Sequence, residues 1–379
     1  MRKKTFESAP EKEKIYIGID VHLKSWTVTI LTENTIHKTF TQPPSAAVLS
    51  DYLKKYFPDL EYFSAYESGF SGFAHHYQLC ELGIKNIVIN AADIPTTQKE
   101  QFQKNDPVDS RKIARALRAK QLTAIHVLSM QTLEDRSLVR TRDTLVKDQA
   151  KLKSRIKSFL RFYGIEIIPQ FSSPNSHWSK RFINWLREDI KLRSCYGNDS
   201  LNFLLASLEN LRTLLLEVEK KIRALCAEER YKKRVALLVS IPGIGRVCAI
   251  TLITQLEDIT RFRNTDTLAS YVGLIPNTYS SGDQEKIGEI TFRGQKQLKT
   301  ILVECAWMTI RCDSAMSSSF NAYCRRMQTN KAIIRMARKL LNRIYYVLKN
   351  EKSYTCGIKN SYYKKSIDTE VTACLTTAS

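Results

Sequence analysis

The chain has 379 residues and a formal net charge of +21, because 59 Lys and Arg outnumber 38 Asp and Glu. Its length and its 43% of hydrophobic residues are typical of a globular protein with two or three domains. We expect neither a membrane span nor a secretion signal, since no stretch approaches 18 uncharged apolar residues. The charge predicts a polyanionic partner, most simply nucleic acid, although an anionic membrane surface would also fit.

The nine cysteines are scattered along the chain, with no CxxC pair and no His at zinc spacing. This pattern indicates reduced thiols, most of them buried. We therefore expect a cytoplasmic protein.

The first part of the chain alternates strands and helices in the order βββ-α-β-α-β-α, which predicts an α/β domain. Strands are predicted over residues 15–22, 26–30, 35–40, 62–67 and 86–90, and helices over about 45–57 and 72–82. A last helix follows Pro107, so Asp106 is expected to cap it and Asp109 to lie in its first turn, where the helix dipole favours negative charge. By themselves, these two acids fit a helix cap and a dipole-matched acid.

Two further acids end predicted strands, Asp20 the first strand and Glu67 the fourth. A buried unpaired carboxylate is costly, so Asp20 is expected to be paired, exposed at the strand end, or bound to a cation. If these strands are neighbours, the helix with Asp106 and Asp109 can pack across both acids. Four carboxylates in one volume repel one another unless divalent cations neutralise them, and such ligands suit two Mg²⁺ or Mn²⁺ ions that assist attack on a phosphodiester.

Residues 129–230 are predicted to form a long helical arm. An apolar residue recurs every seven positions from Leu138 to Phe159, and a second series with 4-3 spacing predicts a coiled-coil seam. That second series comprises Leu204, Leu208, Leu211, Leu215, Val218, Ile222 and Leu225. We expect an antiparallel arm, with a polar insert at 170–200, that pairs with another copy or else forms an internal helical core. Its basic face is expected either to bind a nucleic-acid backbone, through Lys147, Lys151 and Arg155, or to be merely solvated.

A third segment begins at Tyr231 and is predicted to be helical. The turn Pro242-Gly243-Ile244-Gly245-Arg246 is typical of a helix-hairpin-helix, in which Gly243 and Gly245 let a phosphate approach the backbone and Arg246 adds charge, although an ordinary helical turn fits as well. Further on, Ser280-Ser281-Gly282 is interpreted as a loop between helices. A serine becomes a nucleophile when a neighbour accepts its proton, and the carboxylate cluster could serve if the domains meet.

Two motif sets resemble the DEDD transposases, a family of insertion-sequence transposases and related Piv-type DNA invertases. The first set comprises Ile17-Gly18-Ile19-Asp20-Val21, Tyr66-Glu67-Ser68-Gly69 and Lys104-Asn105-Asp106-Pro107-Val108-Asp109-Ser110, with Arg115 and Leu117 following. It resembles the RuvC-like ribonuclease H fold domain of the family. Residues 236–310, with a Ser-Gly pair followed by Arg293-Gly294, resemble its C-terminal transposase domain. Departures from the family pattern are Ser110 for a common Ala, Asp283 for Gly, and Phe292 for Lys.

The resemblance implies that Asp20, Glu67, Asp106 and Asp109 bind the catalytic metal ions. It also implies that Ser281, with Ser280 as the near alternative, becomes covalently joined to a DNA end. Lys104, Arg111 and Arg115 beside the acids and Arg293 after the serine are the further expected nucleic-acid contacts.

A bacterial DNA recombinase is therefore expected, forming a phosphoserine intermediate without ATP. By resemblance it would assemble as a dimer or tetramer, with no membrane partner, and a noncoding bridge RNA would select donor and target DNA. The expected domains are a RuvC-like domain at 1–128, the coiled-coil arm at 129–230, the transposase domain at 231–350 and a polar basic tail at 351–379. The alternatives are a metal-dependent junction nuclease that uses water, an invertase without a guide, and a non-catalytic nucleic-acid-binding protein.

Overall fold

A computed structural model describes residues 13–95, 105–174, 176–281 and 284–356. The chain divides into two compact units, Met1–Leu128 and Ser129–Ser379, and each is described by itself. The described residues form a mixed α/β protein with a five-stranded sheet, a two-stranded sheet and 12 α-helices. Among them no helix is long and apolar enough to cross a bilayer. The predicted boundaries at 230 and 350 remain predictions.

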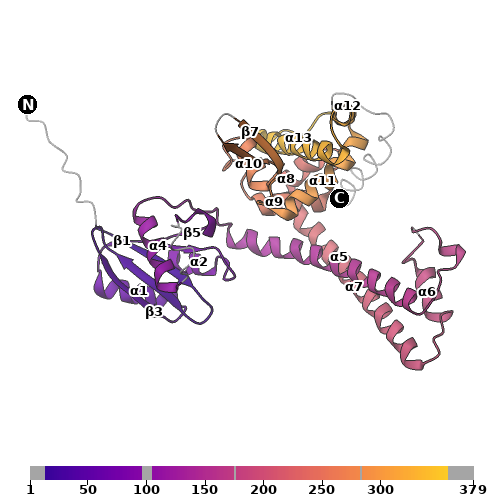
Figure 1. Ribbon diagram of the computed structural model, residues 1–379, viewed down its shortest axis with the longest axis horizontal. Helices are drawn as coiled ribbons and strands as arrows, with labels where there is room; N and C mark the ends of the chain where they lie inside the picture. Colours follow the sequence, from indigo (N-terminus) through magenta and orange to yellow (C-terminus); the bar gives the residue numbers. More distant parts are fainter. Residues whose placement is uncertain (1–12, 96–104, 175, 282–283, 357–379) are drawn as a thin grey trace, which may run out of the picture. The chain divides into compact units, whose positions relative to one another are not determined.

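The first unit is built on a mixed sheet (Figure 1) with the strand order β3-β2-β1-β4-β5. The strands are β1 (Lys14–Val21), β2 (Trp26–Leu31), β3 (Ile36–Gln42), β4 (Glu61–Glu67) and β5 (Lys85–Ile89). The first three strands pair antiparallel, whereas β4 runs parallel to β1 and β5 parallel to β4. The first and fourth strands are thus neighbours, which is the condition under which the helix with Asp106 and Asp109 was expected to pack across both acids.

Helices cover both faces of this sheet. On one face α1 (Ala46–Tyr56) and α2 (Ala74–Glu81) bury a core that includes Ile17, Leu49 and Leu79. On the other face lies α4 (Asp106–Arg118), whose Ala114 packs with Tyr16 and whose Ile113 packs with Ala65. Alternate residues of β1 therefore face different helices, as the two-residue period of a strand requires.

The packing of α4 on β1 is very close at Gly18. A Cβ at this position would lie 2.1 Å from the carbonyl oxygen of Ser110 and 2.5 Å from the backbone nitrogen of Ala114. The Ser110 side chain is buried, and its Oγ lies 2.8 Å from Oγ1 of Thr29 in β2. A glycine in the strand and a hydroxyl pair thus hold the first turns of α4 against the sheet.

The start of α4 differs by one residue from the prediction. Asn105 is the N-cap, with an extended backbone at φ −150° and ψ 129°, and its side chain makes no capping hydrogen bond. Asp106 is the first helical residue, so the prediction that it caps the helix was wrong. Pro107 fits because the first turn of a helix needs no N–H from it.

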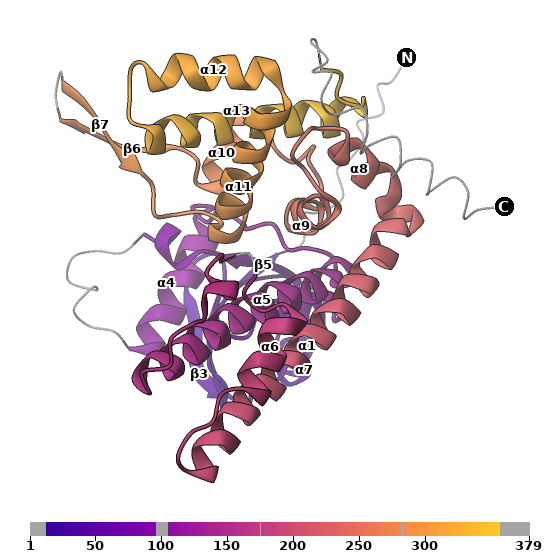
Figure 2. The same cartoon turned by 90° about the vertical axis from the view of Figure 1, so that its right-hand side faces the viewer.

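The second unit begins with an arm of two helices that lie side by side (Figures 1 and 2), α5 (Met130–Phe162) and α7 (Cys195–Ala227). They are antiparallel, because Arg142 near the start of α5 pairs with Glu219 near the end of α7, at 2.9 Å between Nη2 and Oε1. The predicted antiparallel pair of helices is confirmed. Coiled-coil packing with a second copy remains a prediction.

The segment between these helices is not the polar insert that the sequence suggested. It contains the short helix η2 (Pro169–Phe171) and α6 (Lys180–Glu188). Phe171, Phe182 and Trp185 are buried there in a core completed by side chains of α5 and α7. The prediction was wrong because the many Ser and Asn residues obscured an amphipathic helix with aromatic residues on one face.

The rest of the unit is a helical body whose core surrounds α13 (Thr329–Asn350). Its other helices are α8 (Glu229–Val239), α9 (Arg246–Leu256), α10 (Thr265–Val272), α11 (Lys296–Cys312) and α12 (Ser314–Cys324). Between α10 and α11 the chain forms an antiparallel hairpin of β6 (Pro276–Ser281) and β7 (Gln284–Ile290), so the predicted loop was wrong.

Of the eight described cysteines only Cys226 and Cys305 are buried, which also corrects the expectation of mostly buried thiols.

Candidate functional site

The sequence-predicted acids lie on one face of the first unit's sheet, where β1 and β4 end beside the start of α4. We call this place, with Asp20, Glu67, Asp106 and Asp109, the acid edge. In β1, Gly18 contacts α4, and Asp20 follows two residues later at the end of the strand. In the parallel neighbour β4, Ala65 packs against α4, and Glu67 follows it in the same way. The two-residue period of strands places both acids on the side that α4 covers. The first turn of α4 carries Asp106 and Asp109.

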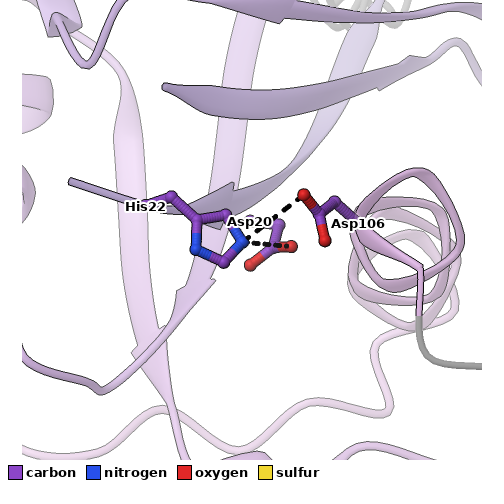
Figure 3. A group of neighbouring side chains, drawn as sticks. All are labelled: Asp20, His22 and Asp106. Atoms are coloured by element: carbon purple, nitrogen blue, oxygen red, sulfur yellow. Dashed lines mark hydrogen bonds and ion pairs between the residues drawn. The ribbon is translucent and has the colours of Figure 1, made fainter. Parts of the chain in front are cut away.

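Three side chains of this edge form a compact cluster (Figure 3): Asp20, His22 and Asp106. One ligand atom from each lies within 4.8 Å of the others, in a search limited to the described residues. His22 Nε2 is 3.3 Å from Oδ2 of Asp20 and 3.6 Å from Oδ2 of Asp106. The structure thus brings together an acid from the first strand and an acid from the helix, with an imidazole whose Nε2 lies close to both.

The other two predicted metal ligands lie outside this cluster. Glu67 is half-buried at the end of β4. Asp109 accepts a hydrogen bond from Lys112 Nζ, at 3.1 Å from its Oδ1. A role for Glu67 and Asp109 as metal ligands therefore stays a prediction.

The electrostatics of the edge favour a bound cation. Burial raises the pKa of the Asp20 carboxyl above its ordinary value, and the charges of Asp106 and Asp109 raise it further, although His22 lowers it. A raised carboxyl pKa means that negative charge is poorly compensated at this point. Two carboxylates and an imidazole supply oxygen and nitrogen donors that fit a divalent cation.

Sequence reasoning did not single out His22 as a site residue. The signal was present, because a residue two positions after Asp20 at the end of a strand projects from the same face. The position of the helix start was needed to see that the imidazole also meets Asp106.

The two candidate nucleophiles, Ser280 and Ser281, are the last residues of β6, paired with Glu285 and Gln284 of β7. Only their backbone is described. The base of the hairpin is firmly held: the N–H of Thr291 donates to Ile275 O at 3.0 Å, and Lys299 Nζ donates to Thr291 O at 2.7 Å. The serines therefore lie at the far end of a two-stranded ribbon that is anchored at its base.

Gly273 explains why this base is so compact. It ends α10 in the left-handed conformation with φ 85°, and a Cβ there would lie 2.2 Å from the carbonyl oxygen of Arg293. The start and the end of the hairpin segment therefore meet backbone to backbone. Only glycine satisfies both the conformation and the space.

The basic residues predicted to contact nucleic acid, near the acids and on the arm, differ in whether they are exposed or already paired within the protein. Arg115 and Arg155 are exposed. Arg111 donates from Nε to Thr39 Oγ1 at 3.2 Å, and so helps to hold α4 on the sheet. Lys147 and Lys151 pair with acids one turn away, Asp143 and Asp148. Lys104 lies outside the described residues.

The Pro-Gly-x-Gly turn does join two helices, α8 and α9. Thr309 of α11 donates to Pro242 O at 2.8 Å, and Gly243 packs against the Thr309 backbone, so this side of the turn is used for packing. Gly245 caps α9 with open space around it, and Arg246 is exposed. The phosphate interpretation thus applies to Gly245 and Arg246, and the helix-hairpin-helix assignment remains a prediction. Arg293 is exposed as well.

A basic surface on α12 and α13 was missed by the sequence analysis. Residues 314–350 contain eight Lys and Arg and no Asp or Glu. Arg338 and Arg343 pair with Asp266 and Asp313 of other segments. Arg325, Arg326 and Lys331, at the corner between the two helices, are exposed. Counting the charged residues in short segments of the sequence would have revealed this basic corner.

Comparison with known protein families identifies the class. A model of DEDD transposases of the IS110 type matches residues 17–165, which include the acid edge. A second model, described as "Transposase IS116/IS110/IS902 family", matches residues 235–321, which include the hairpin with the serines. Both describe transposases, and together they span well over half of the chain. The chain belongs to the IS110/IS116 family of DEDD transposases.

Individual relatives agree with this assignment. The chain is 26% identical to the transposase for insertion sequence element IS1111A of Coxiella burnetii, over 73% of this chain and 74% of that protein. It is 29% identical to y4qE of Sinorhizobium fredii, over 64% of this chain and only 57% of that relative's length. It is 32% identical to the pilin gene-inverting protein of Moraxella bovis, over 32% of this chain and 38% of that protein.

Proposed function

We propose that the protein is a DNA recombinase that cleaves and rejoins strands through a covalent phosphoserine intermediate. In this proposal the first unit has a RuvC-like ribonuclease H fold. The observation that carries the proposal is the cluster of Asp20, His22 and Asp106 where β1 meets the start of α4, with Glu67 at the end of the adjacent strand β4. Carboxylates placed close together repel one another unless cations neutralise them, and a metal-assisted phosphoryl transfer uses such a set.

The four acids would hold divalent cations, Mg²⁺ or Mn²⁺, in a two-ion site. Such ions, when bound, polarise the scissile phosphate and favour the ionised form of the attacking hydroxyl. The protein's own part is to fix the acids. The contact of Gly18 with Ser110 and the bond from Ser110 to Thr29 prevent α4 from shifting along the sheet.

Ser281, or Ser280 beside it, would supply the nucleophile. Its oxygen would attack the phosphorus, the bond to the 3′ oxygen would break, and the leaving 3′ hydroxyl would take up a proton. The phosphoserine ester conserves the bond, so a 3′ hydroxyl from another strand can reverse the step and no ATP is needed. The place of both serines at the end of a β ribbon supports a nucleophile that reaches toward DNA.

The basic surfaces would hold nucleic acid. Arg115, Arg155, Arg246 and Arg293 are exposed and fit contacts to phosphates, as do the residues of the α12 to α13 corner. A bridge RNA that selects donor and target DNA, and assembly into dimers or tetramers through a coiled-coil arm, belong to the same proposal. They rest on the resemblance to the family and on the antiparallel arm.

The test is to trap the covalent species. Wild-type protein incubated with Mg²⁺ or Mn²⁺ and its insertion-sequence DNA should yield a protein–DNA adduct that survives denaturation. Ser281→Ala should abolish the adduct, Ser280→Ala should retain it, and Asp20→Asn should abolish both the adduct and cleavage. Cleavage without any adduct would favour a nuclease that uses water and would contradict the proposal. Sequencing of nucleic acid that copurifies with the protein tests guidance, since a discrete short RNA matching flanking DNA is expected.

A further inference from the structure

The hairpin between β1 and β2 holds His22 beside the acid edge. The backbone N–H of His22 donates to Ser25 O at 3.0 Å, which closes a four-residue connection between the strands. His22 follows Asp20 by two positions, so its side chain returns to the face that α4 covers. Figure 3 shows one nitrogen of the ring facing both carboxylates.

The spacing of the three side chains matches that of ligands around one ion. Bonds of Mn²⁺ or Zn²⁺ to oxygen and nitrogen are about 2.0 to 2.2 Å long, which places neighbouring ligand atoms about 3.0 to 3.5 Å apart. The two distances from His22 Nε2 are 3.3 Å to Asp20 and 3.6 Å to Asp106. Both involve the same nitrogen, as they would if this nitrogen and both carboxylates addressed a common centre.

An ion pair alone accounts less well for this arrangement. The 3.6 Å separation of Nε2 from Asp106 is longer than a hydrogen bond, so an N–H on this nitrogen would bond Asp20 alone, at 3.3 Å. His22 is half-exposed and sits in a turn, where an imidazole is free to face water. Its ring instead faces two carboxylates from different elements of the fold.

We propose that His22 is a metal ligand through Nε2, together with Asp20 and Asp106, and that it makes this site prefer transition-metal ions such as Mn²⁺ over Mg²⁺. This inference rests on the proposed function, because it takes the acid edge to bind a divalent cation. Imidazole nitrogen suits first-row transition-metal ions, and Mn²⁺ accepts it beside oxygen ligands more readily than Mg²⁺, which is bound by oxygen. The set of four acids implied by the family resemblance contains no histidine, so His22 would be a ligand in addition to that set.

The experiment titrates the full-length protein with Mn²⁺ and follows free Mn²⁺ by electron paramagnetic resonance. His22→Ala should weaken Mn²⁺ binding roughly tenfold or more and leave Mg²⁺ binding, measured by competition, within about threefold of wild type. His37→Ala is the matched control, because His37 is an exposed histidine of the same unit that packs against Phe57. It should change neither affinity.

A spectroscopic measurement reports the ligand itself. Electron spin echo modulation of bound Mn²⁺ should show nitrogen coupling in wild type and in His37→Ala, and none in His22→Ala. Thermal unfolding without metal checks that each variant is folded.

Two outcomes separate this inference from the proposed function. If Asp20→Asn abolishes Mn²⁺ binding but His22→Ala binds and shows nitrogen coupling like wild type, His22 is no ligand and the acid site stands. If Asp20→Asn leaves Mn²⁺ binding unchanged, the metal site at this edge is overturned, and the inference with it.

Discussion

The acid edge of the sheet and the β6–β7 hairpin that carries Ser280 and Ser281 differ in how firmly the surrounding structure holds them. The acids sit on a five-stranded sheet against which α4 packs backbone to backbone at Gly18. The serines end a ribbon of two strands, and β6 carries them about 17 Å from its anchored base, at about 3.3 Å per residue. Two strands alone are marginally stable, so the ribbon depends on its base. If the serine is the nucleophile, as we propose, the acids and the nucleophile are carried by elements that are held to different degrees.

The largest effect is expected at the acid edge itself. Asp20→Asn keeps the shape of the side chain and removes its charge, so strand cleavage should fall by roughly 10³-fold with the fold unchanged. Cleavage rates and thermal unfolding, measured on the same preparation, check this. A variant that cleaves at near wild-type rate would show that the chemistry does not use this edge.

Gly18→Ala tests whether the acid edge is fixed by packing. The new Cβ would overlap the backbone of α4, so the first unit should lose about 3 kcal/mol of stability and Mn²⁺ binding should weaken. Gly69→Ala is the control in the same unit, because its nearest contact is 4.0 Å away. Equal stability of the two variants by denaturant unfolding would mean that α4 is not held as tightly as described.

Gly273→Ala makes the corresponding change at the hairpin. A left-handed alanine that also overlaps Arg293 O should cost roughly 2 kcal/mol. Formation of the covalent adduct should decrease, while Mn²⁺ binding at the acid edge should stay as in wild type. Gly164→Ala is the control, because Gly164 is also left-handed, at φ 67°, but a Cβ there would have no atom within 4 Å. If Gly273→Ala weakened metal binding as much as Gly18→Ala, the two regions would not be independent.

The smallest expected effect concerns the basic corner of α12 and α13. Replacing Arg325 and Arg326 by Gln should lower the slope of log affinity against log salt by about 2 in DNA binding, since each lost phosphate contact contributes about 0.9. Lys54→Gln with Lys55→Gln removes the same charge from exposed positions of α1, on the opposite face of the sheet from α4. That control should leave the slope nearly unchanged. Equal slopes for both variants would remove the corner from the DNA-binding surface.

The sequence predicted the framework of the acid edge better than its details. Acids at strand ends and in the first turn of a helix are visible as local patterns, whereas the pairing of β1 with β4 was only assumed and is given by the structure. The closeness of His22 to Asp20 could have been predicted from its place two positions further along the chain, but its closeness to Asp106 depends on a helix start that is distant in sequence. The overlap of Gly18 with Ser110 was hidden for the same reason.

In the second unit, the predictions that proved wrong failed for reasons visible in the local sequence. The hairpin was interpreted as a loop although Gly282-Asp283 separates two runs with strand-forming residues, which is a two-residue turn signal. The aromatic residues of α6 were obscured by polar neighbours. Local signals existed in both places, but they were weaker than the composition around them.

The most direct test of the account is to identify the residue joined to DNA. Adduct formed by wild-type protein with Mn²⁺ is digested, and the DNA-linked peptide is sequenced by mass spectrometry. The account predicts a phosphodiester on Ser281, absent when Asp20→Asn protein is used. Attachment to a residue outside the β6 to β7 hairpin, or an adduct that forms equally well with Asp20→Asn, would contradict it.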